Sequence, residues 1–254
     1  MGLSECGTMW QGIEVWGDKS KTETQVQNPT TGQLYQGKLI LNAAIIRDAH
    51  NGVVAGLAGV NQYNPNFGGG IILASNTQFI NCGYSVRLTQ YPYVSHSRIT
   101  ACAFSSTTLL DPGYSSTNSY NYPNANNQFY GYANATQRSY TFVQAIGVQA
   151  TAIGDNTFDN AEYGVVGIHS SLRVIDWDGN GTGNTFSNTE TSELHGNIFA
   201  SPFFASRVEK NRYTLTTNAI HSVNGIGDSI TGNSIPSASY IAIGAQSSRA
   251  YSIY

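Results

Sequence analysis

A run of acidic and amide residues in the second half of the chain has the residue types and spacing of a calcium-binding loop. Asp176, Asp178 and Asn180 alternate with other residues, and a glycine follows, which fits the pattern Asp-x-Asp-x-Asn-Gly. In such a loop the oxygens at positions 1, 3 and 5 converge on the ion, and the glycine permits the tight turn. The expected calcium ligands are Asp176, Asp178, Asn180 and Thr182.

The closing ligand of this loop is missing. Position 12 is Ser187 where a bidentate Glu is usual, so Glu190 or Glu193 would have to reach back. The alternative interpretation is an Asp- and Gly-rich turn without a metal, because turns use the same composition without ions. Both interpretations stay open at the level of sequence.

Carboxylates upstream of this loop raise the question of polysaccharide cleavage. Glycoside hydrolysis needs two carboxyl groups that flank the scissile bond, and Asp155, Asp159 and Glu162 lie close together in the sequence. Asp155 and Asp159 share one face of a strand only if no turn intervenes. The Gly-His-Gly, Asp-Asp and Arg-x-Lys elements of polygalacturonases are absent. The sequence therefore favours surface carboxylates, assigns no catalytic residue, and favours a role other than catalysis.

The segment from Pro112 to Gln137 is rich in tyrosine and amide residues and contains no charged residue. Exposed aromatic rings pack on sugar rings, and amides form hydrogen bonds with their hydroxyl groups. We expect Tyr120, Tyr122 and Tyr130 to bind glycan. The alternative is a loop that folds back over one flank of the molecule, because large aromatic side chains seldom stay exposed without a partner.

A repeated phrase indicates how these residues are positioned. Each copy has an apolar residue, then any residue, then a small polar residue, then Ala or Cys. The apolar positions are Ile46, Phe79, Phe158 and Ile235, with a partial copy at Phe186. One such unit cannot bury its own apolar side, so the copies must stack. We therefore expect one all-β domain over residues 1–254, a right-handed parallel β-helix (a solenoid) of roughly eight to ten coils.

The small polar position of the phrase is expected to form a bend. Asn tolerates left-handed backbone and can hydrogen-bond across a turn, so Asn81 and Asn160 suit this position. Stacked Asn side chains there would form amide ladders. Insertions at 18–36, 59–70 and 112–137 are expected to project from the stack. A β-sandwich is the competing fold, but it does not account for the shared phrase.

Composition excludes some partners. Only 11% of the residues are charged, and the net charge of -3 gives no basic field for nucleic acid. No run approaches the 18 consecutive apolar residues of a membrane span. Cys6, Cys82 and Cys102 lack metal-ligand spacing, which favours buried free thiols. A disulfide between Cys82 and Cys102 is the alternative.

Three segments carry a family resemblance: Met9–Gly17, Gln36–Leu41 and Ile45–Ala49. Together they resemble the right-handed β-helix region of large secreted or cell-surface proteins of Bacteroidetes, over residues 6–86. The resemblance implies export by type IX secretion. It also implies that the chain is a fragment of a longer protein, because the signal peptide and sorting domain of that family are not visible. Asp228-Ser-Ile matches the O-glycosylation motif of that phylum, so Ser229 is the expected glycosylation site.

These expectations combine into two functional hypotheses. The first is a structural or adhesive β-helix segment that binds a polysaccharide or surface glycan through its insertions. The alternative is a polysaccharide lyase or glycoside hydrolase that acts on an acidic or plant or algal polysaccharide, since pectate lyases share this superfold. A stack of coils has an open edge at each end, so end-to-end self-association is also expected.

Overall fold

The computed structural model is an all-β arrangement of parallel strands. It describes residues 10–24, 28–56, 67–107, 139–181, 183–195, 206–223, 228–246 and 252–253. Within these ranges there are twenty strands and no helix, and every pairing between two strands is parallel. This contradicts the competing β-sandwich, whose sheets are antiparallel.

The strands form two sheets. The eight-stranded sheet contains, in spatial order, β2 (Lys38–Asn42), β5 (Ile71–Ser75), β8 (Arg98–Thr100), β11 (Gln149–Gly154), β13 (Ser171–Ile175), β15 (Arg207–Glu209), β18 (Ser229–Thr231) and β20 (Ser252–Ile253). The main path of the twelve-stranded sheet is β1 (Ile13–Val15), β4 (Asn51–Ala55), β7 (Tyr84–Leu88), β10 (Ser139–Ile146), β12 (Thr157–Ile168), β14 (Thr185–His195), β17 (Thr216–Val223) and β19 (Ala238–Gln246). Four short strands pair beside this path: β3 (Ile45–Arg47), β6 (Gln78–Ile80), β9 (Ala103–Ser105) and β16 (Arg212–Thr214).

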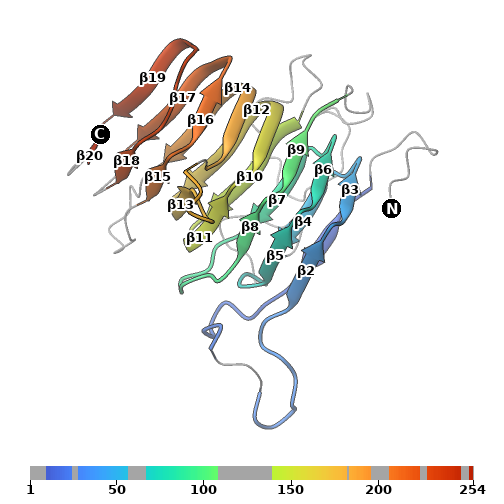
Figure 1. Ribbon diagram of the computed structural model, residues 1–254. Coiled ribbons are helices and arrows are strands. Elements are labelled where there is room, and N and C mark those ends of the chain that lie inside the picture. Colours follow the sequence, from blue (N-terminus) through green and yellow to red (C-terminus); the bar gives the residue numbers. More distant parts are fainter. Residues whose placement is uncertain are drawn as a thin grey trace, which may run out of the picture.

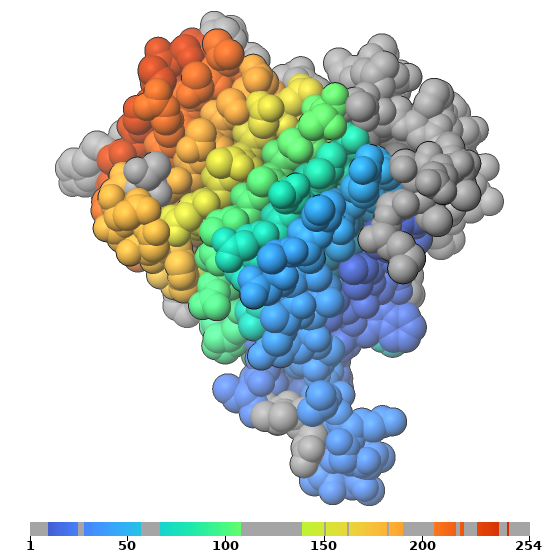
Figure 2. Space-filling model, turned by 45° about the vertical axis from the view of Figure 1, so that its right-hand side comes forward, coloured from blue at the N-terminus to red at the C-terminus, as the bar shows by residue number. Residues whose placement is uncertain are grey.

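Each passage of the chain adds one strand to the eight-stranded sheet and one to the main path of the twelve-stranded sheet, so neighbours in a sheet come from successive passages. Figure 1 shows the result as rows of arrows that run in sequence order from blue to red. In the space-filling view the same passages appear as adjacent bands of colour (Figure 2). The parallel strands and curled sheets are compatible with the predicted parallel β-helix.

Equivalent aromatic residues stack inside the molecule. The rings of Phe79, Phe104, Phe158, Phe186 and Tyr213 follow one another in register, and each is at most 1% exposed. Successive ring centroids are 4.8, 4.8, 4.6 and 4.8 Å apart, and the rings are nearly parallel. Burying one such ring contributes about 1.5–3 kcal/mol. The predicted apolar ladder is therefore present, with two rungs that the repeated phrase had not identified, Phe104 and Tyr213.

The stacked ring lies between two turns, which we call the first turn and the second turn. The first turn joins the eight-stranded sheet to the ring position, and the second turn follows the ring. At the second turn the predicted left-handed backbone is confirmed, with φ of 54°, 51°, 65° and 51° at Asp48, Asn81, Asn160 and Asn188. The predicted amide ladder is not found at these residues. Asn160 donates to the carbonyl of Ser106, and Asn188 donates to the carboxylate of Asp159.

The amide ladder lies at the first turn. Asn156, Asn184, Asn211 and Asn233 occur there on successive coils, at intervals of 28, 27 and 22 residues. Each Nδ2 donates to the Oδ1 of the next Asn, at 2.9, 2.8 and 3.1 Å. The backbone N–H of the same residue donates to that Oδ1 too, at 3.0, 3.0 and 2.9 Å. Each Nδ2 also donates to a backbone carbonyl. The ladder thus satisfies its own polar groups in the interior, as buried polar groups require.

The two cysteines in the described residues are free and buried. Cys102 lies at the first turn, where its N–H donates to Asn156, whereas Cys82 lies at the second turn after Phe79. Because the two thiols lie at opposite turns, they do not meet, and the alternative disulfide between Cys82 and Cys102 is not formed. Burial raises the pKa of Cys82 to about 12 and that of Cys102 to about 11, which keeps both thiols protonated.

The insertion at 18–36 projects from the stack as predicted, and it forms the loop at the bottom of Figure 1. Contacts hold its base: Gln36 donates to two carbonyls of the insertion, and Tyr91 donates to Lys21. The predicted insertion at 112–137, with Tyr120, Tyr122 and Tyr130, lies outside the described residues, as does most of the one at 59–70. No helix in the described part of the chain is long and apolar enough to cross a membrane.

Candidate metal site

Three aspartates meet at the first turn of two neighbouring coils. Gly154 at the end of β11 pairs with Ile175 at the end of β13, so the next residues, Asp155 and Asp176, lie side by side. On the following coil Lys210 has the corresponding place, directly after β15. The turn after β13 is longer than its neighbours, and its extra residues bring Asp178 back toward Asp155.

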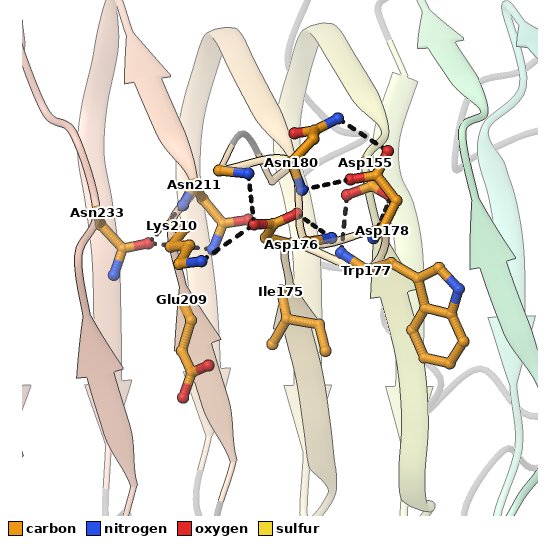
Figure 3. A network of polar contacts seen from close by, with 12 residues as sticks. Asp155, Ile175, Asp176, Trp177, Asp178, Asn180, Glu209, Lys210, Asn211 and Asn233 are labelled. Atoms are coloured by element: carbon orange, nitrogen blue, oxygen red, sulfur yellow. Dashed lines mark hydrogen bonds and ion pairs between the residues drawn. The ribbon is translucent and has the colours of Figure 1, made fainter.

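One carboxylate oxygen from each of Asp155, Asp176 and Asp178 lies within 4.8 Å of the other two. Asp155 accepts hydrogen bonds from the backbone N–H groups of Trp177 at 2.8 Å and Asp178 at 3.1 Å. These bonds fold the loop back onto the preceding coil, as Figure 3 shows. Asp155 therefore organises the loop and also contributes a carboxylate to it.

The side chain of Asp176 is enclosed by its own loop. Its side chain is 3% exposed and accepts hydrogen bonds from the N–H groups of Gly179 and Gly181, both at 2.9 Å. Lys210 Nζ lies 3.2 Å from the Asp176 carboxylate, so one positive charge faces three negative ones. This leaves the cluster with an excess of negative charge.

The electrostatics differ between the acids. Burial raises the pKa of Asp155, and the charges of Asp178 and Asp176 act in the same direction against two backbone hydrogen bonds. For Asp176 burial also favours the neutral form, but hydrogen bonds from Gly181, Lys210 and Gly179 outweigh it, so its pKa lies below the ordinary value. The repulsion between the carboxylates therefore disfavours the ionised form of Asp155, and a bound cation would offset this repulsion.

The predicted ligands are only partly brought together. Asp176 and Asp178 converge as expected, while Thr182 lies outside the described residues. The Asn180 amide donates to Asp178 at 2.8 Å, so its nitrogen faces that carboxylate. Asp155 joins the site although the loop pattern does not contain it. Its position could have been recognised from the phrase Gly154-Asp-Asn-Thr-Phe, which aligns it with the turn.

The missing twelfth ligand is not replaced by Ser187. That residue lies on β14 beyond the ring position, where its hydroxyl donates to Asp159 at 2.9 Å. The side chains of Glu190 and Glu193, the other candidates for closing the loop, lie outside the described residues. The three carboxylates of the cluster are hard oxygen ligands of the kind that calcium selects.

The carboxylates considered for glycoside hydrolysis take part in different networks. Asp155 has left-handed backbone, with φ of 57°, and joins the cluster at the first turn. Asp159 follows Phe158 and accepts hydrogen bonds from Ser187 and Asn188 near the second turn. A turn therefore does intervene between the two acids, and the shared strand face that they would need is lost. The side chain of Glu162 is outside the described residues.

Ser229, the predicted glycosylation site, lies on β18, where it pairs with Arg207 and Ser252 and is partly buried.

Comparison with known proteins adds no relative: no family model, no curated protein and no solved structure matches the chain.

Proposed function

We propose that the chain is a structural and adhesive segment of a secreted or cell-surface protein. In this proposal it is a right-handed parallel β-helix, of the kind found in Bacteroidetes proteins exported by type IX secretion. The observation that supports it is the pair of continuous internal stacks, five aromatic rings beside four amides, which make successive coils one rigid support. Such a support holds loops away from its axis, where they reach a partner.

The adhesive role is assigned to the tyrosine-rich insertion, through Tyr120, Tyr122 and Tyr130. A glycan array with the purified chain tests it: the wild type should bind, and replacing all three tyrosines with Ala should abolish binding at an unchanged melting temperature. Tyr93→Ala is the matched control, because this tyrosine is 38% exposed and does not belong to the insertion. A collapse in stability of the triple variant would instead favour a covering role for the insertion.

The cellular part of the proposal has its own test. An antibody against the chain should label intact producing cells and should stop labelling them when type IX secretion is disabled. The intact mass of native material should show glycan attached at Ser229, and Ser229→Ala should remove it.

Sedimentation at increasing concentration tests end-to-end association. Release of reducing ends or unsaturated products from an acidic polysaccharide would replace adhesion with the enzymatic alternative.

A calcium site is the second candidate, favoured by the 4.8 Å cluster of Asp155, Asp176 and Asp178. Calcium would offset the mutual repulsion of these acids and fix the loop to the preceding coil. Calorimetric titration should give a heat of binding, and saturating calcium at one hundred times Kd should stabilise the fold by about 2.7 kcal/mol. Asp178→Asn should remove both effects while Asp159→Asn keeps them. Neither heat nor thermal shift in the wild type would end this proposal.

A further inference from the structure

The loop of the acidic cluster also places a tryptophan on the outer face of the eight-stranded sheet. Ile153 points inward and is fully buried, so its neighbours Ala152 and Gly154 face outward. Trp177 lies over Gly154, where a Cβ atom would collide with its own. The indole remains 39% exposed and points away from the carboxylates, as Figure 3 shows.

Two arginines flank this indole. Ala152 pairs with Arg98 on one side and Arg173 on the other, so all three residues form one outward row across the strands. The guanidinium carbons lie 5.3 Å and 5.8 Å from the centre of the Trp177 ring, within cation–π range. The row continues to Arg207 on β15.

These two arginines differ from three other cations of the surface. Arg207, Lys210 and Arg47 each form an ion pair with an acid within the described residues, whereas Arg98 and Arg173 form none there. Their positive charge is therefore available to a ligand. An Arg guanidinium presents a planar fork that matches a carboxylate or sulfate group.

An exposed indole between two available guanidinium groups suits a ligand with both an apolar face and negative charge. A sugar ring that bears a carboxylate or sulfate has both, because its C–H face packs on the aromatic ring while the acid meets the arginines. The Cα positions of Arg98 and Arg173 are two strand spacings apart, about 10 Å. A row of this kind favours an extended polymer that crosses the strands.

The same surface is poorly suited to nucleic acid. Duplex DNA carries one negative charge per about 1.7 Å of its axis. The row is bordered by the acidic cluster at Asp155 and Asp176 and by Glu209, which would repel so dense a charge. An acidic polysaccharide carries its charge more sparsely along the chain.

We propose that Arg98, Trp177 and Arg173 form a binding surface for acidic polysaccharide on the outer face of the eight-stranded sheet. This inference rests on the proposed adhesive function only in taking a saccharide as the ligand. It uses neither the tyrosines of the insertion nor the carboxylates of the acidic cluster as ligand-binding groups, and it can fail without either of them.

Affinity measurements with three probes test the proposal: polygalacturonate as a carboxylated polymer, dextran sulfate as a sulfated one, and neutral dextran. All are made in chelator, so that no calcium bridges the polymer to the acidic cluster. The wild type should bind one or both acidic polymers and not neutral dextran. The acidic polymer that binds more tightly identifies the acid group recognised.

Variants locate the binding. Arg98→Gln with Arg173→Gln should weaken binding by tenfold or more, roughly the loss expected for hydrogen bonds to charged groups. Trp177→Ala should weaken it about fivefold through the lost ring contact. The matched controls are Arg212→Gln, an exposed arginine on β16, and Trp16→Ala, which is 50% exposed; neither should change the affinity. Arg98→Lys with Arg173→Lys should give an intermediate loss at an unchanged melting temperature.

Other results would overturn the proposal in distinguishable ways. Unchanged affinity in the arginine and tryptophan variants, with loss in the triple tyrosine variant, would refute this surface and leave the adhesive function standing. No binding to any polysaccharide would refute both. Binding that appears only when the measurement is repeated with calcium in place of the chelator would assign the ligand to the acidic cluster. Tighter binding to a single-stranded oligonucleotide, measured in the same chelator buffer, would refute the ligand class.

Discussion

The two turns of each coil use asparagine in opposite ways. Asn156 and Asn160 stand two residues before and two residues after Phe158, and Asn184 and Asn188 stand likewise around Phe186. In a straight strand all of them would share the inward face of the ring. The Asn before the ring keeps that direction and joins the ladder. The Asn after it has left-handed backbone and donates to a group other than an Asn side chain, such as the carbonyl of Ser106 for Asn160. Backbone conformation, rather than residue type, therefore decides which amides stack.

The most damaging change should be Asn184→Ala, in the middle of the ladder. It leaves the backbone N–H and the side-chain amide of Asn156 without the acceptor that they share, and it removes a donor from the carbonyl of Ile153. Each orphaned buried group costs about 1–3 kcal/mol, so we expect a loss of about 3–5 kcal/mol in the free energy of unfolding. Equilibrium unfolding in urea measures it.

Asn188→Ala is the matched substitution at the second turn. Asn188 is exposed and makes a side-chain bond to Asp159, so the main expected cost is Ala in left-handed backbone, about 1 kcal/mol. Asn188→Gly should recover most of it. If the substitutions at Asn184 and Asn188 cost the same in urea unfolding, the distinction between the turns is wrong.

Extending the ladder should stabilise the protein slightly. Cys102 occupies the rung before Asn156 and donates to it only through its backbone N–H. In Cys102→Asn the new side-chain amide should donate to the same oxygen, and we expect a gain of about 0.5 kcal/mol in the free energy of unfolding. Urea unfolding compares it with Cys102→Ser, which should give no gain; destabilisation relative to serine would show that the ladder cannot grow here.

The smallest effect concerns the outer side of the first turn. Because the pKa of Asp155 is raised on folding, ionising this acid opposes folding as the pH rises through its folded-state pKa. Without calcium, Asp155→Asn should therefore raise Tm by about 1 °C at neutral pH. The difference should vanish near about pH 3, where the acid is protonated in both states. Calorimetric scans at both pH values check this, and a lower Tm at neutral pH would contradict it.

Sequence reasoning identified the stack because its strongest signal is local. Each phenylalanine is followed two positions later by a small polar bend residue. Because these two residues lie so close in the sequence, Phe79, Phe158 and Phe186 could be recognised without a structure. The rung at Phe104 was missed because Thr107 stands where the phrase has Ala or Cys, and the rung at Tyr213 was missed because Leu215 replaces the small polar bend residue. The ladder was assigned to the wrong turn because the residues flanking each ring look alike in sequence.

The candidate site was only half predictable for a related reason. Asp176 and Asp178 belong to one short pattern, which the sequence displays directly. Asp155 joins them through the pairing of β11 with β13, and the Arg98 and Arg173 pair arises in the same way. Register between coils depends on how many residues each coil contains, and insertions change that number from coil to coil.

The order in which the coils form follows from the ladder bonds. Most bonds between neighbouring rungs close loops of similar length, 28, 27 and 22 residues, but the bond from Cys102 to Asn156 spans 54. Doubling a loop costs about 0.6 kcal/mol of closure entropy, before any ordering of the inserted residues. Contacts of short sequence separation form faster. The coils after Asn156 should therefore assemble first as a kinetic unit, and the earlier coils should add to that template across a slower step.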